Sequence, residues 1–93
     1  MTSAARAKDL KKAPAYVLGV GEDLSHIGIS GMPDLTVSGA AISGPKAYAM
    51  AGITSQEVDL AMLYDAFTIN TILFLEDLGF CPKGEGGNFV ANG

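Results

Sequence analysis

The tyrosine at position 64 is the residue best placed to do chemistry. It ends an apolar run, residues 58–64, and is followed by Asp65 and by a second apolar stretch, residues 67–78. A phenol hydroxyl can donate a hydrogen bond to a developing oxyanion and can transfer a proton. A tyrosine that ends a buried strand more often places its hydroxyl on a backbone carbonyl, so Tyr64 also has a purely structural interpretation. Asp65 is expected to cap the helix that follows.

The cysteine and the histidine are each present once and fall in expected loops. Cys81 stands in a turn after a helix, where no helix N-terminus activates a thiol, so we assign it no catalysis. His26 has no partner at metal-ligand spacing, and we predict no metal site. It either faces solvent or lines a substrate pocket.

Three short segments are predicted as strands because they are apolar and rich in aromatic or β-branched residues. They are residues 14–21, residues 58–64 and, less completely, residues 88–91. Between the first two lies a long loop, residues 22–37, of the kind that usually has a function. The motif Gly19-Val20-Gly21 lacks the third glycine of a dinucleotide fingerprint, and we reject that interpretation.

Helices are predicted over three segments. The first is residues 3–12, capped by Ser3. The second is residues 46–51, with Ser43 as its cap and Gly52 as a left-handed stop. The third is residues 67–78, which is apolar on nearly every face. Helices that alternate with strands favour an α/β class with a mixed, largely parallel sheet.

Composition excludes several functions. The chain has ten acidic and six basic residues, a net charge of -4 and a pI near 4.6. Nucleic-acid binding is disfavoured because it needs a basic surface. No apolar run approaches the roughly 20 residues of a membrane span. A single cysteine fits a reducing compartment, and we expect a cytoplasmic protein.

The motif Tyr64-Asp65-Ala66-Phe67-Thr68 and the block from Leu75 to Gly87, with its Glu-Asp-Leu-Gly-Phe-Cys sequence, resemble the thiolase superfamily. The similarity is to thiolase-like lipid-transfer and acetyl-CoA acetyltransferase proteins of the sterol-carrier type. It implies the layered αβαβα thiolase fold. Residues 1–93 would be one partial domain, in which residues 1–37 end the N-terminal half and residues 38–93 start the C-terminal half.

The resemblance implies an acyltransferase of the acetyl-CoA acetyltransferase type that acts on acyl-CoA thioesters in lipid metabolism. Tyr64 would direct its hydroxyl into the acyl-CoA pocket, which Phe67, Met32, Ile42 and His26 would line. Coenzyme A enters as part of the substrate, and no other cofactor is implied. In the family, asparagine or histidine normally stands at this position. The tyrosine found here is compatible with a different reaction, the retro-aldol cleavage of a β-hydroxyacyl-CoA. Relatives with such a tyrosine work with a separate OB-fold acyl-CoA-binding subunit.

Two chemical parts of the family are absent from the sequence, namely the nucleophilic cysteine in its helical context and the Gly-His-Pro histidine. The chain therefore looks like a truncated piece that is inactive alone. A further alternative is a structural module that forms homo-oligomers, because one neighbour cannot cover the apolar segment 67–78.

Overall fold

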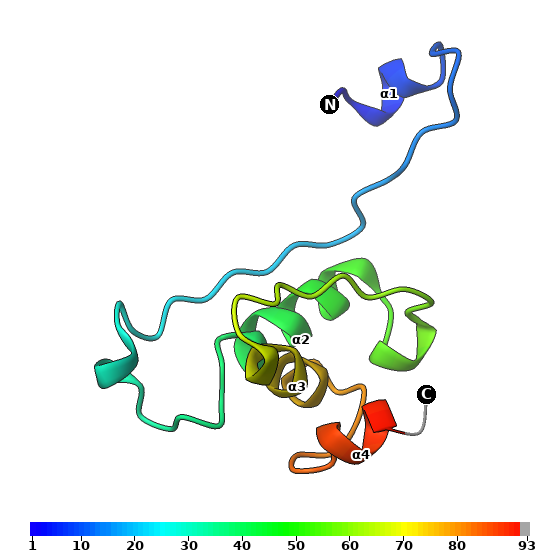
Figure 1. The fold of residues 1–93 in the computed structure, drawn as a ribbon. Helices are drawn as coiled ribbons and strands as arrows, with labels where there is room; N and C mark the ends of the chain where they lie inside the picture. Colours follow the sequence, from blue (N-terminus) through cyan, green and yellow to red (C-terminus); the bar gives the residue numbers. More distant parts are fainter. Residues whose placement is uncertain (92–93) are drawn as a thin grey trace.

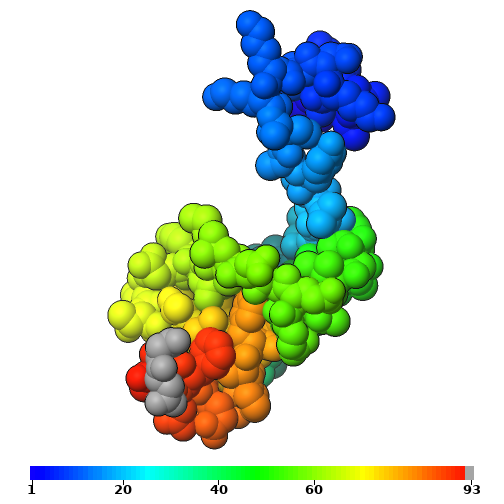
Figure 2. Space-filling model, turned by 90° about the vertical axis from the view of Figure 1, so that its right-hand side faces the viewer, coloured from blue at the N-terminus to red at the C-terminus, as the bar shows by residue number. Residues whose placement is uncertain are grey.

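The computed structural model describes residues 1–91 and is helical with long irregular connections (Figure 1). In chain order the elements are α1 (Ala4–Ala7), the 3-10 turn η1 (Ile29–Gly31), α2 (Ala40–Ala51), the 3-10 turn η2 (Ser55–Glu57), α3 (Thr68–Asp77) and α4 (Gly86–Ala91). Helices α2, α3 and α4 lie together, and α1 lies apart at the end of a drawn-out arm (Figures 1 and 2).

The predicted parallel sheet is wrong, because residues 1–91 contain no strand. Segments 14–21 and 58–64 are apolar as expected but have an irregular backbone. Strand-forming residue types stabilise a strand only through pairing with a neighbouring strand. Neither segment has such a neighbour here. The third predicted strand, residues 88–91, is also wrong, since it forms part of α4.

Helix α2 begins earlier than its proline suggested. It starts at Ala40, with Gly39 at the N-cap, so Ser43 does not cap it and Pro45 lies inside the helix. Pro45 lacks the N–H that would bond the carbonyl one turn earlier, and α2 forms despite that loss. The predicted stop is confirmed, because Gly52 is left-handed with φ 71°.

Helix α3 has nearly the predicted extent and ends in a tight glycine turn. Gly79 has φ 79°, and Phe80 donates its N–H to the Leu75 carbonyl at 2.9 Å. This pairing closes the carbonyl end of a helix whose last groups would otherwise lack donors. Helix α1 is shorter than predicted. It is capped by Ser3, which accepts from the Arg6 N–H, but it ends at Ala7, after which Asp9 and Leu10 donate to carbonyls three residues earlier instead of four.

Two glycines in the arm allow its backbone to lie directly on α2. A Cβ on Gly19 would stand 2.2 Å from the Ala47 carbonyl oxygen, and one on Gly21 would stand 2.1 Å from the Ser43 oxygen. The spacings agree, because two residues of extended chain and four residues of helix each advance about 6 to 7 Å. Gly19-Val20-Gly21 therefore serves close packing against a helix.

Two further glycines set the helix contacts. A Cβ on Gly44 of α2 would stand 2.6 Å from Leu78 Cδ2, at the end of α3. A Cβ on Gly86 of α4 would stand 2.7 Å from Ile72 Cγ2. Both glycines are buried. Close backbone approach therefore brings α2 and α4 onto α3.

The described chain has little interior. Among residues 1–91 the one apolar residue in the buried class is Ala7, and the exposed surface totals 7380 Å². A compact domain of this mass exposes about 5,100 Å². The radius of gyration of 16.0 Å likewise exceeds the about 12 Å of a compact domain. None of the helices in residues 1–91 has the length and apolar character that a membrane crossing requires.

Candidate functional site

Tyr64 stands in the irregular segment that leads into α3, and its side chain is open. It is 76% exposed, and within residues 1–91 its hydroxyl makes no hydrogen bond. The structural interpretation, a hydroxyl held on a backbone carbonyl, therefore has no support within the described chain. The Tyr64 hydroxyl is therefore accessible to a molecule or a chain segment that lies outside the described residues.

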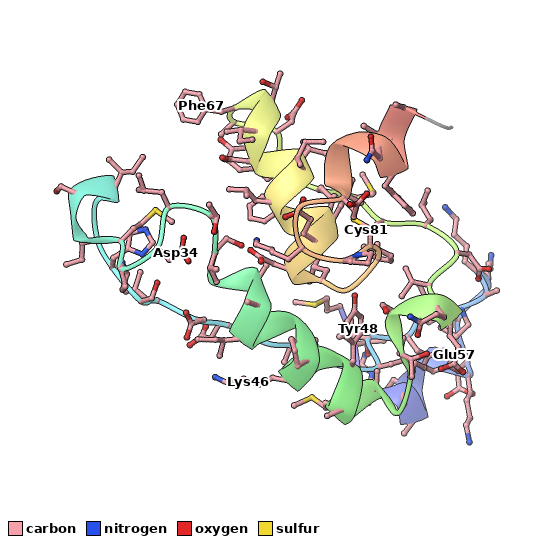
Figure 3. All side chains as sticks on the ribbon, turned by 90° about the horizontal axis from the view of Figure 1, so that it is seen from below. Asp34, Lys46, Tyr48, Glu57, Phe67 and Cys81 are labelled. Atoms are coloured by element: carbon pink, nitrogen blue, oxygen red, sulfur yellow. The ribbon has the colours of Figure 1, made fainter. Side chains whose placement is uncertain are left out.

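Phe67 lies three residues further on, at the N-cap of α3, and is 71% exposed. Figure 3 shows its ring pointing outward from the start of the helix. No side chain caps this helix, so the expected cap by Asp65 is wrong. Tyr64 and Phe67 are thus two exposed aromatic residues in the segment that leads into α3.

The other three predicted pocket residues come from the preceding loop and the start of α2. Met32 ends η1 and is half-buried. His26 is also half-buried and lies beside Gly31, with its Nδ1 at 2.8 Å from the Ser25 hydroxyl. Ile42, in the first turn of α2, is 47% exposed. The predicted residues thus fall into two groups, one on the loop and α2 and one before α3.

A polar cluster that sequence reasoning missed ties these two parts of the chain together. The Asp77 carboxylate, at the last residue of α3, accepts from the Ser38 N–H and the Ser38 hydroxyl, both at 2.7 Å. Its other oxygen accepts from Lys83 Nζ at 2.7 Å, and Lys83 also donates to the Thr36 carbonyl. The Asp77 side chain is 3% exposed. One buried carboxylate therefore joins the end of α3 to the start of α2.

Glu76 holds the following turn in the same way. Its Oε1 accepts the Gly86 N–H at 2.9 Å, and its Oε2 lies 3.5 Å from Lys83 Nζ. The side chain is 6% exposed. The Glu76 carboxylate thereby ties the start of α4 to the end of α3.

The cluster is electrostatically matched. Burial alone would raise the pKa of Asp77, but hydrogen bonds from Lys83 and Ser38 outweigh it and hold that pKa below its ordinary value. The Gly86 and Gly84 backbone N–H groups lower the pKa of Glu76. Burial opposes the charge of Lys83, yet the two carboxylates raise its pKa. All three groups are charged at neutral pH.

The polar cluster could have been predicted from the position of its two carboxylates in the sequence. Glu76 and Asp77 occupy the last turn of a helix, where the helix dipole disfavours negative charge. Acidic residues in that place need donors from elsewhere in the chain. Lys83 is the nearest cation in the sequence, six residues beyond Asp77.

Two further polar contacts lie at the carbonyl end of α3. Tyr48 donates its hydroxyl to the Leu78 carbonyl at 3.2 Å, and Ser55 donates to the Gly79 carbonyl at 2.9 Å. Burial raises the pKa of Tyr48, so its hydroxyl stays protonated as a donor. Separately, at the start of η2, the Glu57 carboxylate accepts the Thr54 N–H at 2.8 Å.

Cys81 lies close to this cluster (Figure 3) but is not an activated thiol. Burial raises its pKa, and the charges of Glu76 and Glu85 raise it further. A thiol with a raised pKa is a poor nucleophile at neutral pH, which agrees with assigning it no catalysis. No group of three or more metal-binding side chains occurs within the described part of the chain.

One surface hollow of about 570 Å³ lies on the N-terminal arm, away from the two groups of predicted residues. It is lined by Met1, Thr2, Ala4, Ala7, Leu10, Pro14, Ala15, Tyr16 and Val17. None of the five predicted site residues is among them. The described chain therefore places none of the predicted residues in this hollow.

The fold and the motif around Tyr64 place the chain in a known class. Residues 21–93 match the thiolase C-terminal domain-like family, and the chain belongs to it. The predicted membership of the thiolase superfamily is thereby confirmed.

Particular relatives include enzymes of two kinds. The chain is 36% identical, over all of its length, to 25% of a 17-hydroxy-3-oxo-4-pregnene-20-carboxyl-CoA lyase of Mycobacterium tuberculosis. It is 35% identical, over 94% of its length, to 23% of an acetyl-CoA acetyltransferase of Methanothermobacter thermautotrophicus. Among solved structures, the Ltp2-ChsH2(DUF35) aldolase matches 97% of this chain with a TM-score of 0.84 and 30% identity, over 25% of its own chain. The chain thus spans about a quarter of the length of these relatives.

Proposed function

We propose that the protein carrying this chain acts on acyl-CoA thioesters, with Tyr64 as the donor to the thioester oxygen. The observation that supports this most strongly is the open phenol at the start of α3, in a chain whose relatives are named as acting on coenzyme A esters. The role of Tyr64 and the pocket formed by Phe67, Met32, Ile42 and His26 are parts of the proposal.

Of the two candidate reactions, retro-aldol cleavage is the better supported. The lyase and the steroid side-chain-cleaving aldolase of Thermomonospora curvata each align with the whole of this chain. In this reaction a general base takes the β-hydroxyl proton of a β-hydroxyacyl-CoA. The Cα–Cβ bond then breaks, a carbonyl product leaves, and the acyl-CoA enolate is protonated at Cα. Tyr64 would donate to the thioester oxygen while the enolate charge develops there.

Acyl transfer of the acetyl-CoA acetyltransferase type is the second candidate, and it is favoured by the similarity to the archaeal acetyltransferases. The two reactions differ in thiol release. Condensation of two acetyl-CoA molecules frees one coenzyme A, whereas aldol cleavage leaves the thioester intact. Measuring free thiol alongside carbonyl product from a β-hydroxyacyl-CoA therefore separates them.

Tyr64→Phe in the whole protein tests the shared part of both mechanisms. We expect kcat to fall about 10²-fold to 10³-fold, the cost of removing one oxyanion donor. The melting temperature should stay unchanged, because the hydroxyl makes no hydrogen bond within residues 1–91. Tyr16→Phe is the matched control, because it removes an exposed phenol hydroxyl on the N-terminal arm, outside both groups of predicted residues. Turnover that survives Tyr64→Phe would remove the tyrosine from the mechanism.

The partners implied by this proposal are the acyl-CoA substrate, a second copy of the chain and an OB-fold acyl-CoA-binding subunit. A solved relative is titled as an Ltp2-ChsH2(DUF35) aldolase, which supports a partner subunit. Apolar side chains that are more than half exposed support self-association, including Val17, Leu60 and Met62. Copurification with the subunit, and sedimentation of the chain alone, distinguish these partners.

A further inference from the structure

The Asp77 cluster links the loop before α2, on the side of one group of predicted pocket residues, to α3, on the side of the other. The two oxygens of the Asp77 carboxylate bind different residues. Oδ2 accepts two hydrogen bonds from Ser38, and Oδ1 accepts one from Lys83. At 3% exposure the carboxylate is shielded from water, so these hydrogen bonds do not compete with solvent.

On one side of the cluster lies the loop and the start of α2. Ser38 directly precedes the N-cap of α2, and its hydroxyl oxygen accepts the Ala40 N–H at 3.2 Å. Lys83 holds the same stretch a second time, through the Thr36 carbonyl. The positions of Met32, six residues earlier, and of Ile42, in the first turn of α2, depend on these attachments.

On the other side of the Asp77 cluster lies helix α3. Asp77 is its last residue, and its first turn follows the segment that carries Tyr64 and Phe67. A helix of 10 residues is about 15 Å long and transmits the position of one end to the other. The Asp77 cluster therefore sets where the two predicted groups lie with respect to each other.

We infer that Asp77, Ser38 and Lys83 form a positioning cluster for the acyl-CoA site, by holding the loop and α2 in register with α3. This inference rests on the proposed function and adds to it. Asp77, whose side chain is 3% exposed, acts through Ser38 and Lys83 and not on the substrate itself. It acts on KM rather than on kcat, because Tyr64 stays on its own segment when the loop moves.

Ser38→Ala and Ser38→Thr in the whole protein test the inference. Removing the hydroxyl takes away one of the two Ser38 hydrogen bonds to Asp77 and the acceptor for Ala40. We expect KM for acyl-CoA to rise about twofold to thirtyfold with kcat nearly constant, the range that corresponds to the effects of substitutions within a coupling network. Ser38→Thr keeps the hydroxyl and should restore the original KM.

Tyr48→Phe is the matched control, since it removes another hydrogen bond between α2 and the end of α3 without touching the loop. It should leave KM unchanged. An equal rise of KM in Tyr48→Phe, or no rise in Ser38→Ala while Tyr64→Phe is inactive, would overturn the inference alone. Failure of the whole protein to bind any acyl-CoA in calorimetry would overturn the inference and the proposed function together.

Discussion

At the scale of the residue, the carbonyl end of α3 is where the nearly buried carboxylates of the described chain lie. Asp77 and Glu76 are nearly removed from water, yet each has donors within the described chain. Leaving one such carboxylate without its partner costs more than the pair contributes, because desolvation is then not compensated. Substitutions at this point therefore have defined and testable costs.

Gly86→Ala is predicted to destabilise the chain. The new methyl group would meet Ile72 Cγ2 at 2.7 Å, Glu76 Oε1 at 2.9 Å and the Ile72 carbonyl oxygen at 3.1 Å. Overpacking of this kind costs about 1 to 3 kcal/mol. Urea unfolding of the whole protein measures it. Gly87→Ala is the control, because nothing lies within 4 Å of a Cβ there. Equal stability of the two variants would contradict the packing of α4 on α3.

Stability is predicted to depend on pH through the same carboxylates. The pKa values of Asp77 and Glu76 are lowered by folding, so their contribution is fully present above their ordinary values of 3.8 and 4.5. It is lost as the pH falls through the lower values of the folded state. Melting temperature measured from pH 6 to pH 2 should fall in that range. Asp77→Asn should make the decline shallower, and an unchanged profile would contradict the assignment.

At the scale of the element, the arm and α2 are held by backbone contact. Gly21→Ala would place a methyl group 2.1 Å from the Ser43 carbonyl oxygen, a contact that backbone atoms cannot relieve without moving apart. We expect the arm to separate from α2 and to be cut by protease at least tenfold faster. Gly28→Ala, which meets nothing within 4 Å, should be cut at the original rate. Protection of the arm in Gly21→Ala would show that the contact does not hold it.

Local signals in the sequence predicted some elements and missed others. The third helix was predicted within one residue at each end, and the left-handed stop at Gly52 was recognised, because each depends on neighbours along the chain. The strands failed since pairing depends on a second segment. Helix α2 began four residues before the start that a cap at Ser43 predicts, because Ser38 and Asp77 meet across 39 positions.

The candidate site was likewise predicted in one part and missed in another. Tyr64 and Phe67 were identified from a contiguous motif, and both stand at the start of α3. Their catalytic and pocket roles, and those of Met32, Ile42 and His26, stay predictions. The Asp77 cluster was missed because its members come from three separate segments. Only the presence of two acids at a helix C-terminus pointed to it.

At the scale of the whole molecule, the excess of exposed surface is the main feature. The 7380 Å² exceeds the value for a compact domain by about 2,300 Å², an area in the range that permanent interfaces bury. Side chains on the arm account for part of it, among them Tyr16 and Leu18, at 60% and 62% exposure.

The chain alone is therefore predicted to associate as its concentration rises. Sedimentation velocity over a hundredfold range of concentration should show a growing weight-average mass, because apolar surface of this extent is rarely left in water. Leu18→Lys with Met62→Lys should reduce the mass toward that of one chain, and Lys46→Glu, on the exposed side of α2, is the control (Figure 3). A single monomeric boundary throughout would contradict the expectation.

The uneven anchoring of α3 has a consequence for how such a protein changes over evolutionary time. Its carbonyl end is fastened by charged and neutral hydrogen bonds, whereas its amino end, at Phe67, has no side-chain cap. Under the proposed function, inherited substitutions near the amino end would alter which substrate the protein accepts at little cost to its folding. Diversification of substrate range is thus expected to accumulate there, while the opposite end stays fixed.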